Sequence, residues 1–244
     1  MTKLYLFIYC NSEQIGRDTM ENEQSVIGIQ YGDVDGDYKC EKIILMGTPY
    51  QEGSSFMSEL ELIVHYMDDA KFKFKIDFSG YAMNLFLGDF LQEGSDQILI
   101  IGQSGGSGNY ALARLYKFEQ SRLKLVIDDE DLSNLLRYQT YYQNDGEIGI
   151  KSLTTGAGFT LNIRGRRLTS PGYNPMPQPL SVPSVSNINS IYPIKQPYSN
   201  YYTLQIQQRI IGEVNADLLG MMQSIIEITQ SVPVIQTQAI VQFT

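Results

Sequence analysis

The stretch YGDVDGDYKCEKIILM, residues 31–46, places an acidic, glycine-containing loop directly before an apolar run. Aspartates occupy alternate positions at Asp33, Asp35 and Asp37. Asp and Gly favour tight turns because Asp bonds to nearby backbone and Gly adopts positive φ. A continuous apolar run such as Ile43–Met46 is typical of a strand covered on both faces. The stretch therefore predicts a turn that leads into a buried strand.

The same pattern recurs along the chain, which indicates a repeat protein. LGDFLQEG at 87–94 leads into the apolar run 98–101, a weaker copy runs from 191 to 206, and spacing predicts another around 141–150. A repeating unit of this kind suits a four-stranded blade. We therefore expect an all-β, β-propeller-like repeat domain of about four to five blades.

Other segments also show strand signals. KFKFKIDF at 71–78 alternates charged and apolar residues, as a half-buried strand does. It is expected to pair with 59–64, and 111–116 with 123–127. Residues 218–228 have a weak helical pattern that Gly220 disfavours.

Composition limits the classes of protein. The chain has 244 residues, 43% of them hydrophobic, and a net charge of −9. This predicts one folded domain over 1–244 and argues against nucleic-acid binding, since the longest basic patch is Arg164–Arg167. No segment is long and apolar enough to span a bilayer. The short apolar segment 4–10 is expected to be a strand, with a secretion signal as the alternative.

Residues 168–199 hold seven of the nine prolines, mixed with Ser, Asn and Tyr. This composition predicts an irregular insertion within the domain, either a tolerated surface loop or a docking arm for a partner.

The first acidic loop is the sharpest candidate for chemistry. Carboxylates of Asp33, Asp35, Asp37 and Glu41, with the carbonyl of Lys39, would supply the hard oxygen ligands that Ca²⁺ prefers. The alternative is an acidic β-turn that bonds only its own backbone. We therefore predict one calcium site here.

The later copies are poorer in ligands. Asp89 and Glu93 remain in the second loop, which is a weaker candidate because Leu91 replaces an acid and Gln97 is neutral. The third copy has Lys195 at the first ligand position, which excludes calcium there.

These loops resemble the FG-GAP/VCBS repeat, the blade unit of integrin-α-like propellers. The chain looks most like small single-domain VCBS-repeat proteins of spore-forming bacteria. The matching stretches are Gly32–Glu41, Leu85–Phe90, Ser104–Gly108, Arg209–Gly212, Asn215–Asp217 and Leu219–Gly220. The resemblance implies a calcium-stabilised propeller without established catalytic residues, and favours a spore or cell surface. Because no clear signal peptide is seen, a cytoplasmic location is the alternative.

Enzyme signatures are weak. The one histidine, His65, lies in an expected strand, and the Gly-rich loop 102–109 lacks the Lys-Ser/Thr of a P-loop. The acidic run 128–131 is expected to be a solvated turn. Cys10 and Cys40 are expected to be two reduced core thiols, with a disulfide between neighbouring strands as the alternative. We expect a non-enzymatic binding or structural module that acts through a protein partner or self-assembly. The alternatives are a carbohydrate-binding or carbohydrate-active domain and an intracellular interaction protein.

Overall fold

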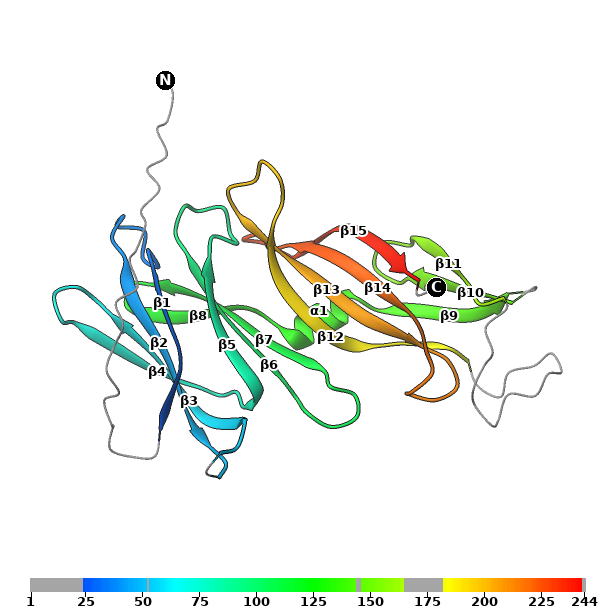
Figure 1. Ribbon diagram of the computed structural model, residues 1–244. Helices are drawn as coiled ribbons and strands as arrows, with labels where there is room; N and C mark the ends of the chain where they lie inside the picture. The colour runs from blue at the N-terminus through cyan, green and yellow to red at the C-terminus, as the bar shows by residue number, and fades with distance from the viewer. Residues whose placement is uncertain (1–23, 52, 144–145, 165–181, 243–244) are drawn as a thin grey trace, which may run out of the picture.

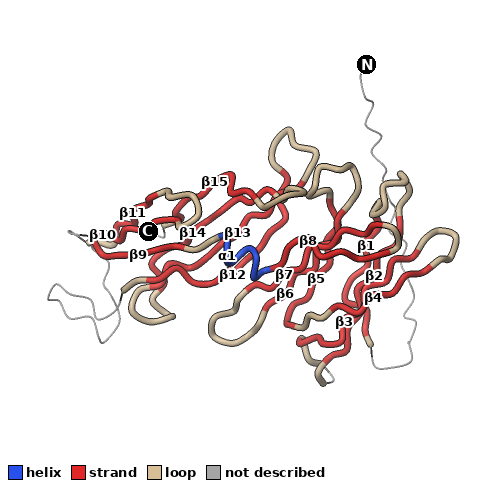
Figure 2. Tube along the Cα trace, turned by 180° about the vertical axis from the view of Figure 1, so that it is seen from behind, coloured by secondary structure: helices blue, strands red, loops and turns tan. Residues whose placement is uncertain are grey.

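The computed structural model describes residues 24–51, 53–143, 146–164 and 182–242, which form strands and one short helix (Figures 1 and 2). The elements are β1 Ser25–Gly32, β2 Glu41–Pro49, β3 Phe56–His65, β4 Lys71–Ile76, β5 Gly80–Gly88, β6 Gln97–Gln103, β7 Ala111–Glu119, β8 Arg122–Asp128, α1 Asp129–Leu135, β9 Tyr138–Gln143, β10 Glu147–Ser152, β11 Gly158–Asn162, β12 Ser184–Lys195, β13 Tyr202–Ile211, β14 Leu218–Glu227 and β15 Val234–Val241. The expected all-β class is confirmed.

The strands form three antiparallel sheets. The first sheet has eight strands in the order β1-β2-β3-β5-β6-β7-β8, with β4 paired to β3. Only two residue pairs, Phe56 with Tyr81 and Met57 with Gly80, join β3 to β5. The other sheets run β11-β10-β9 and β12-β13-β14-β15. In Figure 1 the molecule is elongated, with β1–β4 at one end and β9–β11 at the other.

The expected closed propeller is not found among the described residues. Sequential strands pair as meanders, as a blade repeat predicts, but the sheets are open and follow one another along the molecule (Figure 1). Local hydrophobic patterns specify which residues pair. They do not specify ring closure, which depends on how successive sheets are rotated against each other.

The alternating segment around β4 behaves as predicted. Its lysines are exposed and its apolar side chains turn inward, and the strand pairs with β3 from Leu60–Ile76 to His65–Lys71. The connecting turn contains Asp69 with a positive φ of 67°. His65 Nε2 lies 3.3 Å from Asp69 Oδ1 in this hairpin.

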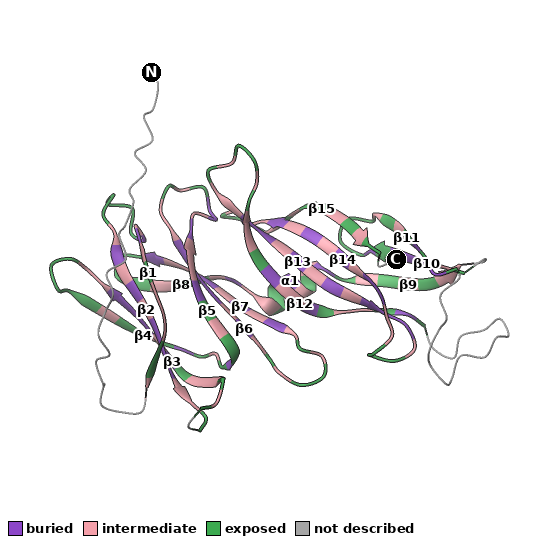
Figure 3. Ribbon diagram, in the orientation of Figure 1, coloured by how far each residue is buried: buried purple, intermediate pink, exposed green. Residues whose placement is uncertain are grey.

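The continuous apolar runs form largely buried strands, as predicted. Burial in β2 and β6 follows their apolar residues (Figure 3). Residues 218–227 form a strand, β14, so Gly220 correctly disfavoured a helix. Residues 104–110 connect β6 and β7, so most of the glycine-rich stretch 102–109 lies in the expected hairpin connection.

One hydrophobic cluster bridges the first and third sheets. Leu99 and Leu115 of the first sheet and Phe90 of its β5–β6 loop pack in the same core as Leu204 and Ile226 of the third sheet. The ring of Tyr202 lies 5.0 Å from Phe86 and 5.8 Å from Phe90, centroid to centroid. The two sheets are therefore joined by shared apolar burial.

The expectation of an irregular insertion over 168–199 is partly wrong. Residues 184–195 form β12, the edge strand of the third sheet, while 165–181 lie outside the described residues. Pro193 is tolerated because an edge strand pairs on one side only, so a missing N–H need not break a ladder.

The acidic run 128–131 was also misinterpreted, since it starts α1. Asp128 caps the helix by accepting from the Asp131 N–H, and the Asp131 side chain accepts from the Asp128 N–H. This capping box satisfies two otherwise unpaired donors, and acids in the first turn suit the helix dipole.

Three further expectations concern the ends of the chain. Cys40 is disulfide-bonded, so the expectation of a reduced thiol is wrong at this position. The segment 4–10 lies outside the described residues, so its expected strand is not tested. Among the described helices, none has the length and apolar character needed to cross a membrane.

Candidate metal centre

The loop between β1 and β2 is organised by Asp33. Its Oδ1 accepts the Gly36 N–H at 2.7 Å and its Oδ2 accepts the Tyr38 N–H at 2.9 Å. Both donors belong to residues with positive φ, 83° for Gly36 and 67° for Tyr38. The carboxylate therefore holds the backbone in a conformation that only glycine adopts without strain.

Asp35 and Asp37 complete an exposed acidic group. The two Asp35 oxygens accept the Asp37 N–H at 3.1 Å and the Tyr66 hydroxyl at 2.8 Å. Asp37 accepts the Lys39 N–H at 2.8 Å and pairs with the Lys39 ammonium at 2.9 Å. With Asp33, these residues each offer an oxygen, and the three oxygens lie within 4.8 Å of one another.

This donor set fits a hard divalent cation in part. Ca²⁺ takes about 6–8 oxygens at about 2.3–2.6 Å, and carboxylates are among its preferred ligands. Each carboxylate oxygen has about two lone-pair sites, so one hydrogen bond leaves capacity for an ion. The Lys39 ammonium competes for Asp37, lowering the pKa of Asp37 while its own is raised. A cation would have to displace this exposed ion pair.

Glu41 lies apart from the acidic group, which differs from the expected ligand set. It is the first residue of β2, its side chain is 2% exposed, and Oε2 accepts the Val34 N–H at 3.0 Å. Burial raises the pKa of Glu41 to about 7, and the charges of the three nearby aspartates add to this effect. Glu41 therefore anchors the base of the loop from inside.

The second loop has the same frame without the acidic group. Asp89 accepts the N–H groups of Glu93 at 3.1 Å and Gly94 at 2.9 Å. Gln97 occupies the place of Glu41 and accepts the Phe90 N–H at 2.6 Å. Glu93 turns away to Lys117, 2.8 Å from its ammonium. In the part of the chain that the structure describes, no second acidic metal group forms.

In the third copy, Lys195 lies over the ring of Tyr202, with its ammonium 5.4 Å from the centroid. An ammonium group, rather than a carboxylate, therefore lies at the first ligand position of this copy.

Asp96 is a participant that sequence reasoning missed. Its N–H donates to the Asp33 carbonyl at 2.6 Å, and a Cβ on Gly32 would stand 2.4 Å from its Oδ2. The Tyr202 N–H donates to the Asp89 carbonyl at 2.7 Å, and a Cβ on Gly88 would stand 2.6 Å from its ring. The Gly32–Asp33 pair therefore lies in close contact with Asp96, and the Gly88–Asp89 pair with Tyr202.

The pKa values of Asp96 and Tyr66 are both raised, in part by the nearby carboxylates. The pKa of Asp96 is raised to about 6 by burial and by the charges of Asp89 and Asp33. The pKa of Tyr66 is raised by burial and by its bond to Asp35. Asp96 could have been found from the sequence, because it is an acid placed directly before the buried strand β6. Tyr66 follows β3 and contacts the loop from a distance along the chain, so no local pattern marks it.

The positive φ of Tyr38 predicts that a glycine at this position stabilises the protein. Replacing it by glycine should raise the free energy of unfolding by about 0.5–1 kcal/mol, because relief of left-handed strain outweighs the extra chain entropy of glycine. Urea unfolding measures the difference. Tyr50 is a matched control, since both side chains are 78% exposed and only Tyr38 has positive φ. Tyr50→Gly should destabilise, and a gain of similar size there would contradict the strain argument.

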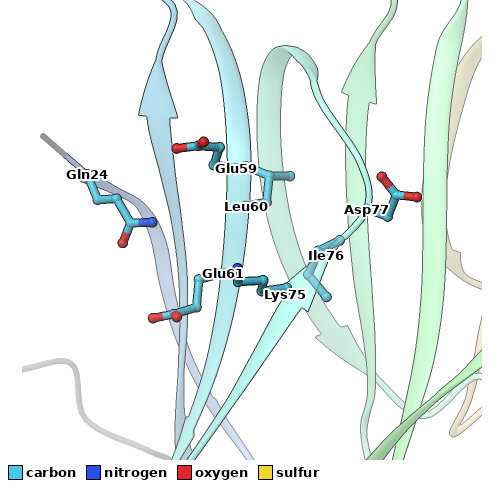
Figure 4. Close-up of a pocket in the computed structure, with 7 residues that line it drawn as sticks. All are labelled: Gln24, Glu59, Leu60, Glu61, Lys75, Ile76 and Asp77. Atoms are coloured by element: carbon cyan, nitrogen blue, oxygen red, sulfur yellow. The ribbon is translucent and has the colours of Figure 1, made fainter. Parts of the chain in front are cut away.

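A second acid-lined hollow, of about 420 Å³, lies beside β3 and β4. Figure 4 shows Glu59 and Glu61 directed toward Gln24, while Asp77 points away on the other side. Glu61 is also paired with Lys73 at 3.2 Å. The acids of this hollow are not among the described residues whose carboxylates converge as a group of three, and Lys75 also lines it.

Comparisons with known proteins correct the family assignment. Residues 136–241 match the family model described as the YybI C-terminal domain. The chain is 24% identical over 214 residues to the uncharacterized protein YybI of Bacillus subtilis (strain 168), covering 84% of this chain and 80% of that protein. No solved structure matches it. The resemblance to FG-GAP/VCBS repeats is therefore wrong, because the matched family is a different one and the described sheets are open.

The segment that matches the family model coincides with the second and third sheets. It begins directly after α1 and spans β9 to β15, the strands of the second and third sheets. The acidic loop lies outside it, in the first sheet.

Proposed function

We propose that this chain is a non-enzymatic structural or binding module whose first hairpin loop is stabilised by one Ca²⁺ ion. The observation that carries the proposal is the convergence of Asp33, Asp35 and Asp37, whose oxygens lie within 4.8 Å. Three carboxylates at this distance repel one another, and a divalent cation would remove that repulsion.

The position of the loop gives the ion a structural task. Asp33 both organises the loop and, through its carbonyl, accepts the N–H of Asp96 from the next hairpin. A cation that fixes Asp33 would therefore fix the contact between the first two hairpins. Such an ion would have a structural role and no catalytic one. The carboxylates of Asp33, Asp35 and Asp37 support a structural role, because each also accepts a backbone N–H of its own loop.

Calcium should raise the thermal stability of the protein. In a calorimetric melt, saturating CaCl₂ against EDTA is expected to raise Tm by about 5–10 °C, since a ligand at 100 times its Kd adds about 2.7 kcal/mol. Asp35→Asn removes one carboxylate charge without changing its shape and should abolish most of the shift.

Asp69→Asn is the matched control. Its side chain is 94% exposed and lies in the β3–β4 hairpin, so the calcium shift should persist in this variant. Equal melting temperatures of the wild-type protein in calcium and in EDTA would disprove the calcium proposal. A shift that survives Asp35→Asn would place the ion elsewhere.

The partner is proposed to be a protein, either another chain or a second copy. Exposed tyrosines support this, because Tyr supplies contact area at low entropy cost. Tyr141, Tyr192 and Tyr198 are all exposed, and Tyr198 is fully so.

A further inference from the structure

A separate hollow of about 250 Å³ lies between the first and third sheets. One wall is a face of β5 and β6, including Ala82, Asn84 and Gln103. The other wall is formed by consecutive residues 189–193 of β12. β12 is an edge strand, so the hollow faces its outer edge.

Backbone irregularities frame the hollow on both sides. The β5–β6 register shifts between Tyr81 and Asn84, where Ala82 has a φ of 49°. The β12–β13 register shifts between Ile188 and Ser190, which leaves Asn189 without a cross-strand partner. Bulges re-aim side chains and are frequent beside binding sites.

The wall at Asn189 is fixed in place. Its Oδ1 accepts the Ser186 hydroxyl at 2.7 Å and the Arg209 N–H at 3.0 Å. Its Nδ2 donates to the Gly108 carbonyl at 3.0 Å. The bulge is thus held by three bonds and does not depend on a ligand.

The lining mixes apolar and uncharged polar side chains and carries no charged one, although the protein has a net charge of −9. Asn84, Gln103 and Ser190 offer amide and hydroxyl groups, and their side chains form no hydrogen bond to any other described residue. Phe86 and Ile191 add apolar surface, and the half-exposed Tyr192 lies at the rim. Donors and acceptors are therefore available beside apolar faces.

We propose that this hollow binds a neutral, hydroxyl-rich ring, such as one hexose unit of a glycan. The ring hydroxyls would bond to Asn84, Gln103 and the β12 edge, and its C–H face would lie on Tyr192. A volume just below the usual 300–1,000 Å³ of drug-sized sites suits about one ring. The uncharged lining selects against acidic or cationic sugars, since it offers no ion pair to offset their desolvation.

An extended peptide added to β12 is less well supported. Strand addition needs a regular row of free N–H and C=O groups. The β12 edge is interrupted by two register shifts, between Val185 and Ile188 and between Ile188 and Ser190, and by Pro193, which has no N–H. The geometry therefore favours a compact ligand.

The test uses saturation-transfer NMR and calorimetric titration with glucose, galactose, mannose and N-acetylglucosamine. Glucuronic acid and glucosamine serve as charged counterparts. At least one neutral sugar should bind with a Kd below about 10 mM, and the charged forms at least about fivefold more weakly. Tyr192→Ala should raise the Kd at least about tenfold, and Gln103→Ala, on the opposite wall, several-fold.

Tyr198→Ala is the matched control, because Tyr198 is fully exposed and does not line the hollow. It should leave the Kd unchanged, and circular dichroism should show each variant folded. The proposal is overturned if no neutral sugar gives a signal at about 10 mM. It is equally overturned if binding survives both Tyr192→Ala and Gln103→Ala. Because the hollow shares no residue with the acidic loop, sugar binding should persist in EDTA whether or not the loop binds calcium.

Discussion

Replacing Phe90 by alanine is expected to lower the free energy of unfolding by about 3–5 kcal/mol, the range for deleting a fully buried aromatic side chain. Phe90 is 0% exposed and packs against Phe86 and Tyr202 in the core shared by the first and third sheets. For a protein of this size the loss corresponds to a fall in Tm of about 6–20 °C. Calorimetry measures it directly.

Phe90→Leu is the control, since it keeps most of the apolar volume and should cost much less. If the first and third sheets unfolded independently, the wild-type melt would already show two transitions. A fall in Tm below about 2 °C would contradict the shared core.

Glu41→Gln is expected to stabilise the protein at alkaline pH. Burial raises the pKa of Glu41 to about 7 from an ordinary value of 4.5. The folded state therefore binds this proton more tightly than the unfolded state, and stability due to Glu41 is present below about pH 4.5 and lost as pH rises to about 7. The amide cannot ionise, so at pH 8 the variant should be more stable by about 2–3 kcal/mol.

The second hairpin shows that glutamine fits this place, because Gln97 accepts the Phe90 and Leu91 N–H groups and donates to the Ser95 carbonyl. Urea unfolding at pH 5 and pH 8, both in EDTA, measures the difference. Glu59→Gln, on an exposed side chain, should give equal differences at both pH values. The same result for Glu41→Gln would show that its carboxylate carries no penalty when ionised. Some pH dependence should remain in the variant, because the pKa of Asp96 is also raised, to about 6.

Much of the strand content follows from local pattern. Period-two alternation located β4 and its pairing with β3, and apolar runs located β2 and β6. Pairings of this kind depend on neighbouring residues and short turns. Ring closure depends on the long-range arrangement of the sheets, and no closed ring is found among the described residues. The expected family was wrong because the short acidic loop is not specific to one family.

Two local errors have physical causes. The charge of the run 128–131 predicts a solvated turn, but Asp128 and Asp131 have the spacing of a capping box and start a helix. Prolines between 168 and 199 suggested irregular chain, but an edge strand accommodates Pro193 in β12.

The candidate site was predicted in part. Alternation brought Asp33, Asp35 and Asp37 together. The same alternation does not extend through the turn, so Glu41 enters β2 with its side chain inward. Glu93 and Tyr66 depend on partners far along the chain, Lys117 and Asp35, that no loop pattern specifies.

The links between successive hairpins are made by peptide groups, from Asp96 to Asp33 and from Tyr202 to Asp89. A peptide link requires only a glycine for clearance and is indifferent to most side chains around it. Acidic residues can therefore be lost from one loop after another during sequence divergence while the sheets stay connected. The connection between the sheets therefore does not depend on the acidic character of either loop.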